Sequence, residues 1–244
     1  MISKYGFDQI RNLEQATELA LSREGVRDLT VLKRLPNLRS LSLRGQEVMD
    51  LSPLRFLGKL RGLTLDRASV RDFSPLSSLS NLRSLSIRNC RVDARQLVGI
   101  KELETLTLWS AEIKDAEALT KALNLRTLML FDTAVDTEFL GGMSQIRELR
   151  LSGFDGTAIS GLGHLHELKS LTIIGGNLGD IRWLPGLESL ENLDLYSVAI
   201  SESAAFPTLP KLKKLKLNLK GTAVATELAK ELRRKFAGAK VTTT

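Results

Sequence analysis

The stretch Leu63-Thr-Leu65-Asp-Arg-Ala-Ser-Val70-Arg-Asp-Phe73-Ser-Pro75-Leu76-Ser-Ser-Leu79-Ser-Asn-Leu82-Arg-Ser-Leu85 is one unit of a repeat that covers most of this 244-residue chain. The unit opens with a Leu-x-Leu pair, and the next unit opens at Leu85 in the same way. Ten such pairs follow one another at spacings of 21 or 22 residues, and a fixed period of this length is typical of a solenoid. The pairs are Leu19/Leu21, Leu41/Leu43, Leu63/Leu65, Leu85/Ile87, Leu106/Leu108, Leu128/Leu130, Leu149/Leu151, Leu171/Ile173, Leu193/Leu195 and Leu215/Leu217.

The Leu-x-Leu pairs predict short parallel strands. In an extended strand the two leucines point to one side and the intervening residue to the other. One strand cannot bury its leucines alone, but stacked units form a parallel sheet with a continuous leucine core. The rest of each unit has apolar residues about every third position, as in Leu51, Leu54 and Leu57, which favours a short helix or 3-10 turn. We therefore expect an α/β, right-handed solenoid with the sheet on the concave face and these turns on the convex face.

These units resemble the leucine-rich repeat family in its short bacterial form. The segments Leu51-Ser-Pro-Leu54 and Phe73-Ser-Pro-Leu-Ser-Ser-Leu-Ser-Asn-Leu82 look like internalin-type repeats of about 22 residues. The resemblance extends from Leu19 to Leu217 and implies the fold, but such folds serve many functions. The family usually has Asn three residues after the second leucine, and that Asn is absent here, where Ala68 and Cys90 are typical occupants. We therefore expect backbone groups in this turn to pair with each other or with water.

The chain is predicted to form a single leucine-rich repeat domain, residues 1–244. Residues 1–18 would form an N-terminal cap, 19–220 the ten repeats and 221–244 a basic C-terminal cap helix and strand. Cys90 is the single cysteine, so an intrachain disulfide is excluded. The first residues lack the apolar run of a signal peptide, and no stretch has the eighteen or so uncharged apolar residues of a membrane span. These features predict a cytoplasmic protein that does not contact a membrane.

The sequence contains no recognisable catalytic or metal-binding constellation. The two histidines, His164 and His166, have no further ligands at a suitable spacing. Cys90 lies in an inward-facing column and is interpreted as structural. The glycines at 153, 156, 161, 163, 175 and 176 follow no phosphate-binding pattern and are interpreted as loosening the turns of two repeats. We expect a protein that is not an enzyme and needs no cofactor.

The concave face carries the candidate binding residues. Four of five consecutive units place a large apolar side chain just after the second leucine, where the core does not need it: Trp109, Phe131, Ile174 and Tyr196, with Met129 beside Phe131. Aromatic side chains also suit strands for structural reasons alone. Because monomers seldom expose contiguous apolar patches, we favour a protein-binding face with these residues as anchors. The residues expected to set the partner's orientation are Arg44, Asp66, Arg88, Arg150 and Asp194. A second copy of the chain is one candidate partner, and a bacterial immunity or regulatory role is an analogy from the fold.

The positive charge is concentrated at the C-terminal end. Residues 211–244 carry 10 Lys and Arg against 2 Asp and Glu, whereas residues 1–210 carry 25 against 26. The basic residues are Lys211, Lys213, Lys214, Lys216, Lys220, Lys230, Arg233, Arg234, Lys235 and Lys240. They form either a solvated cap or an alternative site for an acidic protein, RNA, DNA or an anionic membrane surface. Nucleic acid ranks second, since a nucleic-acid groove would want basic residues along the concave face.

Overall fold

The computed structural model describes residues 13–21, 28–45, 48–133, 137–153, 159–200, 206–219, 225–238 and 240–243. The chain forms two compact units, Met1–Leu125 and Arg126–Thr244, and each is described here by itself. Parts of the predicted N-terminal cap, including Phe7 and Ile10, lie outside the described residues.

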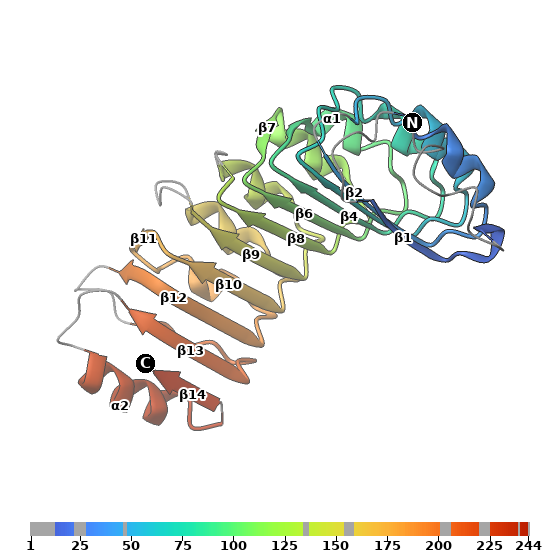
Figure 1. Cartoon of the computed structure of the whole chain (residues 1–244). Coiled ribbons are helices and arrows are strands. Elements are labelled where there is room, and N and C mark those ends of the chain that lie inside the picture. The colour runs from blue at the N-terminus through green and yellow to red at the C-terminus, as the bar shows by residue number, and fades with distance from the viewer. Residues whose placement is uncertain are drawn as a thin grey trace. The chain divides into compact units, whose positions relative to one another are not determined.

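The first unit is built on a parallel sheet in the order β1-β2-β3-β4-β6 (Figure 1). These strands are β1 (Glu18–Leu21), β2 (Ser40–Arg44), β3 (Gly62–Asp66), β4 (Ser84–Arg88) and β6 (Thr105–Trp109). Two further strands, β5 (Arg91–Asp93) and β7 (Glu112–Lys114), pair in parallel beside it. The return segments are η3 (Leu13–Gln15), η4 (Thr30–Arg34), η5 (Ser52–Phe56), η6 (Ser74–Ser78) and η7 (Ala116–Lys121), which are 3-10 helices, and the α-helix α1 (Ala94–Leu97).

The second unit repeats this plan with the order β8-β9-β10-β12-β13-β14. Its strands are β8 (Thr127–Phe131), β9 (Glu148–Ser152), β10 (Ser170–Ile174), β11 (Asn177–Gly179), which pairs with β12, β12 (Asn192–Ile200), β13 (Lys214–Leu219) and β14 (Lys240–Thr243). Its 3-10 helices are η8 (Glu138–Gly142), η9 (Ser160–His164) and η10 (Leu184–Gly186). The α-helix α2 (Ala225–Lys235) precedes β14, which pairs in parallel with β13 (Figure 1).

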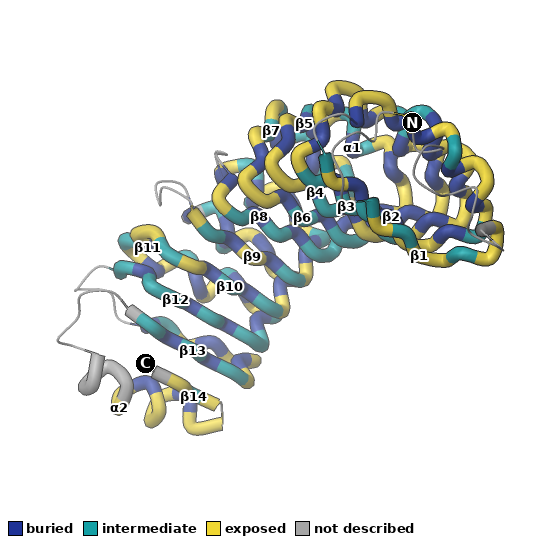
Figure 2. Tube along the Cα trace, viewed as in Figure 1, coloured by how far each residue is buried: buried dark blue, intermediate teal, exposed yellow. Residues whose placement is uncertain are grey.

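The leucine pairs form the core, as the repeat predicts. All ten Leu-x-Leu pairs lie in strands, and in each unit they are in register with the pair of the neighbouring strand, as Leu41 is with Leu63 and Leu171 with Leu193. Both leucines of a pair are buried in every strand except β1, whose Leu19 and Leu21 are half-buried, and the residue between the leucines is not buried (Figure 2). Burying an aliphatic side chain of this size stabilises the fold by roughly 1.5–3 kcal/mol. The predicted parallel-sheet repeat with 3-10 turns is therefore confirmed.

The turn after each strand is held in a conformation that the sequence did not predict. In seven of the sequence repeats, the residue two positions after the second leucine adopts a positive φ of 46–74°. These residues are Arg67, Asn89, Ser110, Asp132, Gly153, Gly175 and Ser197. This left-handed bend aims its N–H at the next unit, so that the Arg67 N–H donates to the Arg88 carbonyl (3.0 Å) and the Asn89 N–H to the Trp109 carbonyl (2.9 Å). Backbone groups thus pair with each other here, as expected from the missing Asn.

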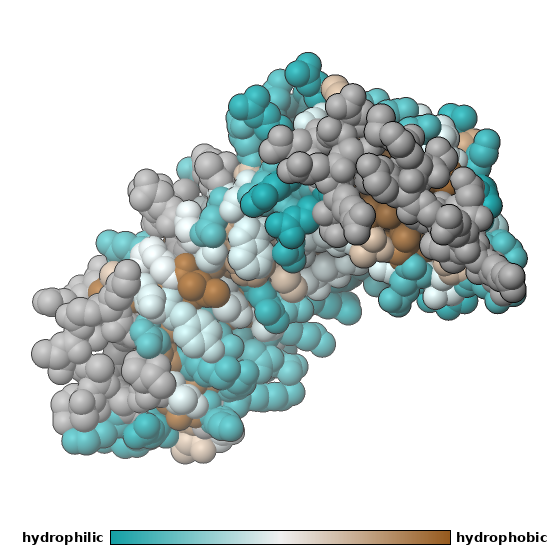
Figure 3. Space-filling model, in the orientation of Figure 1, coloured by the Kyte–Doolittle hydropathy of each residue, from teal (hydrophilic) through white to brown (hydrophobic). Residues whose placement is uncertain are grey.

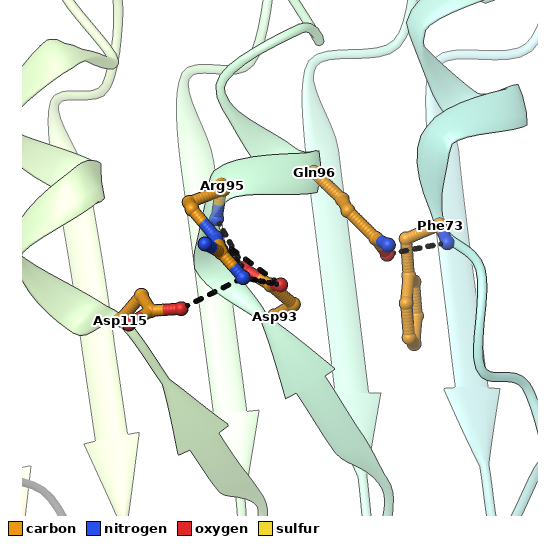
Figure 4. Close-up of polar contacts among 5 residues, drawn as sticks. All are labelled: Phe73, Asp93, Arg95, Gln96 and Asp115. Atoms are coloured by element: carbon orange, nitrogen blue, oxygen red, sulfur yellow. Dashed lines mark hydrogen bonds and ion pairs between the residues drawn. The ribbon is translucent and has the colours of Figure 1, made fainter.

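Aspartates begin several of the return segments. The carboxylates of Asp50, Asp72 and Asp180 each accept a hydrogen bond from the backbone N–H two residues later, at 2.8–2.9 Å. Figure 4 shows the same arrangement at Asp93, whose partner Arg95 also pairs with Asp115 at 3.0 Å. Ser52 is the first residue of η5 and donates its N–H to Asp50, so the aspartate carboxylate and not the serine hydroxyl caps this helix. Hydrogen bonds from Ser74 lower the pKa of Asp72, and those from Arg182 lower the pKa of Asp180.

These caps predict a specific loss of stability in acid. A carboxyl whose folded pKa lies below its unfolded value of 3.8 stabilises the fold above that value, and the contribution disappears as the pH falls through the folded pKa. We expect the melting temperature to be nearly constant above about pH 5 and to fall below about pH 4. The variant Asp72→Asn/Asp180→Asn should melt lower at neutral pH and show a shallower acid decline, measured by circular dichroism. Parallel acid declines in both proteins would contradict this role.

Candidate protein-binding face

The open face is the side of each sheet that points away from the leucine core. It is formed by three residues per strand: the one before the first leucine, the one between the leucines and the one after the second. In the second unit this face carries a brown, apolar area among white and teal side chains over β9, β10 and β12 (Figure 3). A side chain placed here is not required for the core, so its chemistry is available to a partner.

On β2, β3, β4 and β6 of the first unit the last outward position is charged or aromatic. Arg44 on β2 pairs with Asp66 on β3 at 3.2 Å, and the second oxygen of Asp66 accepts a hydrogen bond from the Asn89 side chain at 2.9 Å. Arg88 on β4 lies over the ring of Trp109 on β6, with its guanidinium carbon 5.3 Å from the ring centroid. Trp109 nevertheless exposes 41% of its surface. A cation over an indole in water contributes roughly 0.5–1 kcal/mol, and it fixes the orientation of both side chains.

In the second unit the predicted apolar neighbours do occupy paired positions. Ile174 on β10 lies opposite Tyr196 on β12, and Ile174 exposes 40% of its surface. Met129 and Phe131 are outward residues of β8, and both are half-buried. Phe131 lies opposite Ser152 on β9, a small residue that leaves space beside the aromatic ring. Trp109 belongs to the first unit and Phe131 to the second.

Charged groups border the apolar residues of the second unit. Arg150 pairs with Glu148 on its own strand at 2.8 Å. Asp194 lies 3.8 Å from the Lys214 ammonium and 3.7 Å from that of Lys216, and its other oxygen is buried without a hydrogen-bond partner. The Lys216 nitrogen lies over the Tyr196 ring, 5.9 Å from its centroid. Interaction with the Tyr196 side chain, and then the charge of Asp194, raises the pKa of Lys216.

The basic residues of the C-terminal end do not form one cluster. Lys214 and Lys216 lie on the open face beside Asp194, whereas Lys213 lies before β13 and pairs with Glu191 at 2.8 Å. On α2, Lys235 donates to the Phe206 carbonyl oxygen, and Arg233 and Arg234 are exposed neighbours. Lys211 is exposed in the loop before β13, while Lys220 lies outside the described residues. Internal carboxylates thus already partner several cations of the alternative site.

The remaining candidate chemistry residues have structural surroundings. Cys90 exposes only 6% of its surface, its thiol donates to the Arg88 carbonyl at 3.0 Å, and burial raises its pKa. A ring nitrogen of His166 lies 3.0 Å from the Gly186 carbonyl oxygen. Within the described part of the chain, no group of three or more His, Cys, Asp and Glu residues is placed to hold a metal ion. No helix in the described ranges is long and apolar enough to cross a membrane.

One set of exposed cations was missed by the sequence predictions. Arg39, Arg61 and Arg83 each stand two residues before the first leucine of a pair, just before β2, β3 and β4, and all three are exposed. The signal was present as an arginine repeated every 22 residues. It was missed because only the three positions inside each strand were compared.

Comparisons with known proteins agree with this architecture. No family model and no curated sequence matches the chain. Among solved structures it is similar to an internalin (inlF) of Listeria monocytogenes, with a TM-score of 0.67 and 24% identity over 86% of this chain and 62% of that one. A leucine-rich repeat protein of Leptospira interrogans matches with a TM-score of 0.70 and 18% identity, over 91% and 59%. The mouse RP105/MD-1 complex matches with a TM-score of 0.62 and 21% identity, over 83% and 39%.

The chain spans less than two thirds of each of these matched chains. At these identities the likeness concerns the fold, which the strand register and 3-10 returns establish independently. The protein therefore has the leucine-rich repeat fold, similar to that of internalins and other leucine-rich repeat proteins.

Proposed function

We propose that this chain is a non-catalytic scaffold that binds a partner protein through the open face. The observation that carries the proposal is the exposure of Trp109 and Ile174, at 41% and 40%, on a face that the core does not use. Large side chains that are desolvated at an interface dominate binding energies, each contributing about 2 kcal/mol or more. Trp109 would anchor the partner on the first unit, and Phe131, Met129, Ile174 and Tyr196 on the second.

The polar residues beside the anchors supply orientation. Arg88 lies over Trp109 in the first unit, and Asp66 and Arg44 occupy the same outward position on the next two strands, while Arg150 and Asp194 border the apolar residues of the second unit. The Asp194 carboxylate and the Lys214 and Lys216 ammonium groups beside it offer charges of both signs to a partner. Among the structural neighbours, RP105 was solved in complex with MD-1, which supports a binding role for this fold. We further propose a cytoplasmic, regulatory partner for this scaffold.

The test is capture from host lysate, read by mass spectrometry, with anchor variants and a matched control. The variants are Trp109→Ser in the first unit and Ile174→Ser/Tyr196→Ser in the second. The control is Phe56→Ser, because Phe56 is also an exposed aromatic, at 50%, with an arginine over its ring at 4.8 Å, but lies in η5. All proteins must first show the same circular dichroism spectrum.

We expect the anchor variants to retain less than about a tenth of the partner captured by wild type, since loss of one anchor reduces affinity by about 30-fold. Phe56→Ser should capture the wild-type amount. Binding through the aromatic anchors should also persist at high salt, whereas phosphate-driven binding weakens steeply. Equal capture by wild type and both anchor variants would exclude the open face as the binding site.

A further inference from the structure

The exposed arginines before the strands of the first unit form a regular line, here called the arginine row: Arg39, Arg61 and Arg83. Consecutive members are joined by backbone hydrogen bonds, from the Arg61 N–H to the Arg39 carbonyl at 2.8 Å and from the Arg83 N–H to the Arg61 carbonyl at 2.9 Å. They therefore occupy successive rungs of one ladder, about 4.8 Å apart. All three side chains lie at the edge of the sheet where the strands begin.

This arrangement is unfavourable for the isolated fold. Like charges directly opposite each other on neighbouring strands destabilise a sheet. Arg83 has an internal partner in Glu104, the residue at the next rung. Arg39 and Arg61 form no ion pair with any described residue, in contrast to Arg44, which pairs with Asp66. The row thus offers unneutralised guanidinium groups at a fixed spacing on a unit that is basic overall, since residues 1–125 carry 20 Lys and Arg against 15 Asp and Glu.

We propose that the arginine row binds carboxylates displayed along one face of an α-helix of the partner protein, with the helix lying across the strands. Residues three or four apart on a helix have Cβ atoms roughly 5–6 Å apart, close to the spacing of the row. Guanidinium groups bind carboxylates through two parallel hydrogen bonds, which gives both affinity and register. This inference rests on the proposed protein-binding function and adds the chemical character of the partner.

The surroundings of the row favour a protein partner over nucleic acid. The outward positions next to it are small, Ser40, Gly62 and Ser84, so a helix can approach the sheet closely. Carboxylates also lie on this unit, Asp66 at the other end of β3 and Glu104 beside Arg83. A phosphate backbone with uniform negative charge would be repelled by both, whereas a helix can present neutral or basic residues to them.

The experiment measures binding of a synthetic helix to the whole chain. The probe is a fluorescent Ala-rich peptide of about 20 residues, long enough to hold a helix, with Glu at i, i+4, i+7 and i+11. A second peptide has Gln at the same positions, and a single-stranded oligonucleotide of similar length is the third probe. The row variant is Arg39→Gln/Arg61→Gln/Arg83→Gln. Its control, Lys33→Gln/Arg55→Gln/Lys121→Gln, loses the same charge from the 3-10 helices η4, η5 and η7.

We expect wild type to bind the Glu peptide at low salt and to prefer it to the Gln peptide. The row variant should bind about tenfold more weakly, because each exposed ion pair contributes up to a factor of about five. The control should stay within about twofold of wild type. If the control bound the Glu peptide as weakly as the row variant, the effect would come from net charge and the proposal would be wrong. The proposal would also be wrong if wild type did not bind the Glu peptide. Row-dependent binding of the oligonucleotide without the peptide would overturn it in favour of nucleic acid. The proposed protein-binding function is tested by the Trp109 and Ile174/Tyr196 variants, so a failure of that function can be distinguished from a failure of the arginine-row proposal.

Discussion

The substitution Phe73→Ala is expected to lower the free energy of unfolding by about 3–5 kcal/mol. Phe73 is fully buried and is among the largest side chains of the core. It stands just before η6, and its backbone N–H donates to the side-chain oxygen of Gln96 in the next unit at 2.8 Å (Figure 4). Truncation removes the ring and leaves a cavity between neighbouring repeats. The cavity cannot fully collapse, because each repeat is held in place by the repeats on either side. Urea denaturation followed by circular dichroism measures the loss.

The conservative change Phe73→Leu separates ring burial from general disturbance. The preceding unit has Leu51 at the corresponding position, and that leucine is equally buried. Phe73→Leu should therefore lower the free energy of unfolding by less than about 1.5 kcal/mol, since the preceding repeat accommodates a leucine at the same position. If Phe73→Leu destabilised the protein as much as Phe73→Ala, the effect would arise from the ring's shape, and the cavity explanation would be wrong.

The repeat made the fold predictable, but the details of its turns were not. Leu-x-Leu at a period of 21 or 22 residues determines which side chains are inward, and every predicted pair is buried where expected except Leu19/Leu21 in β1, which is half-buried. The sequence indicates the left-handed bend only in part: Asn89, Asp132, Gly153 and Gly175 are residue types that adopt it readily, whereas Arg67, Ser110 and Ser197 are not. At positions such as Arg67, hydrogen bonds between stacked repeats, like the one from the Arg67 N–H to the Arg88 carbonyl, maintain the bend.

The family's asparagine ladder has a counterpart at a different turn. The side-chain amides of Asn37, Asn81 and Asn124 donate to the carbonyls of Glu14, Gly58 and Lys101, respectively, each 23 residues earlier, at 2.7–2.8 Å. These asparagines stand before the strand, whereas the family position stands after it. The sequence prediction considered only the position three residues after the second leucine, where asparagine is absent. It therefore did not recognise the asparagines that stand before the strands.

The open face was predictable in outline and not in its contacts. Strand register follows from the repeat, so the pairing of Ile174 with Tyr196 could be derived from sequence. The placement of Arg88 over Trp109 depends on side-chain rotamers, which the repeat does not specify. This contact bears on function, because a partner that covers Trp109 also meets a guanidinium group already held in place. Less side-chain entropy is then lost on binding.

The second large effect is expected at the glycines of the second unit. A Cβ atom added to Gly186 in η10 would lie far inside contact distance of the Gly163 carbonyl oxygen, and one added to Gly163 in η9 would lie 2.9 Å from the Trp183 carbonyl oxygen. A Cβ at Gly141 in η8 would likewise be 2.9 Å from the Gly161 carbonyl oxygen. The 3-10 helices therefore pack backbone against backbone. The interpretation that Gly163 loosens its turn is wrong, since its missing side chain permits tighter packing.

Gly186→Ala should accordingly destabilise the protein by about 1–3 kcal/mol, the usual effect of overpacking a tight site. Because the obstructing atoms belong to backbone, no side-chain rotation can relieve the contact. For a protein of this size the melting temperature should fall by about 2–4 °C per kcal/mol. Gly58→Ala is the matched control, because a Cβ there meets nothing within 4 Å, and it should be neutral or slightly stabilising. Gly163→Ala should fall between the two. If all three variants had the melting temperature of wild type, the 3-10 helices could move apart at no cost in stability. The close backbone packing would then not contribute to the stability of the second unit.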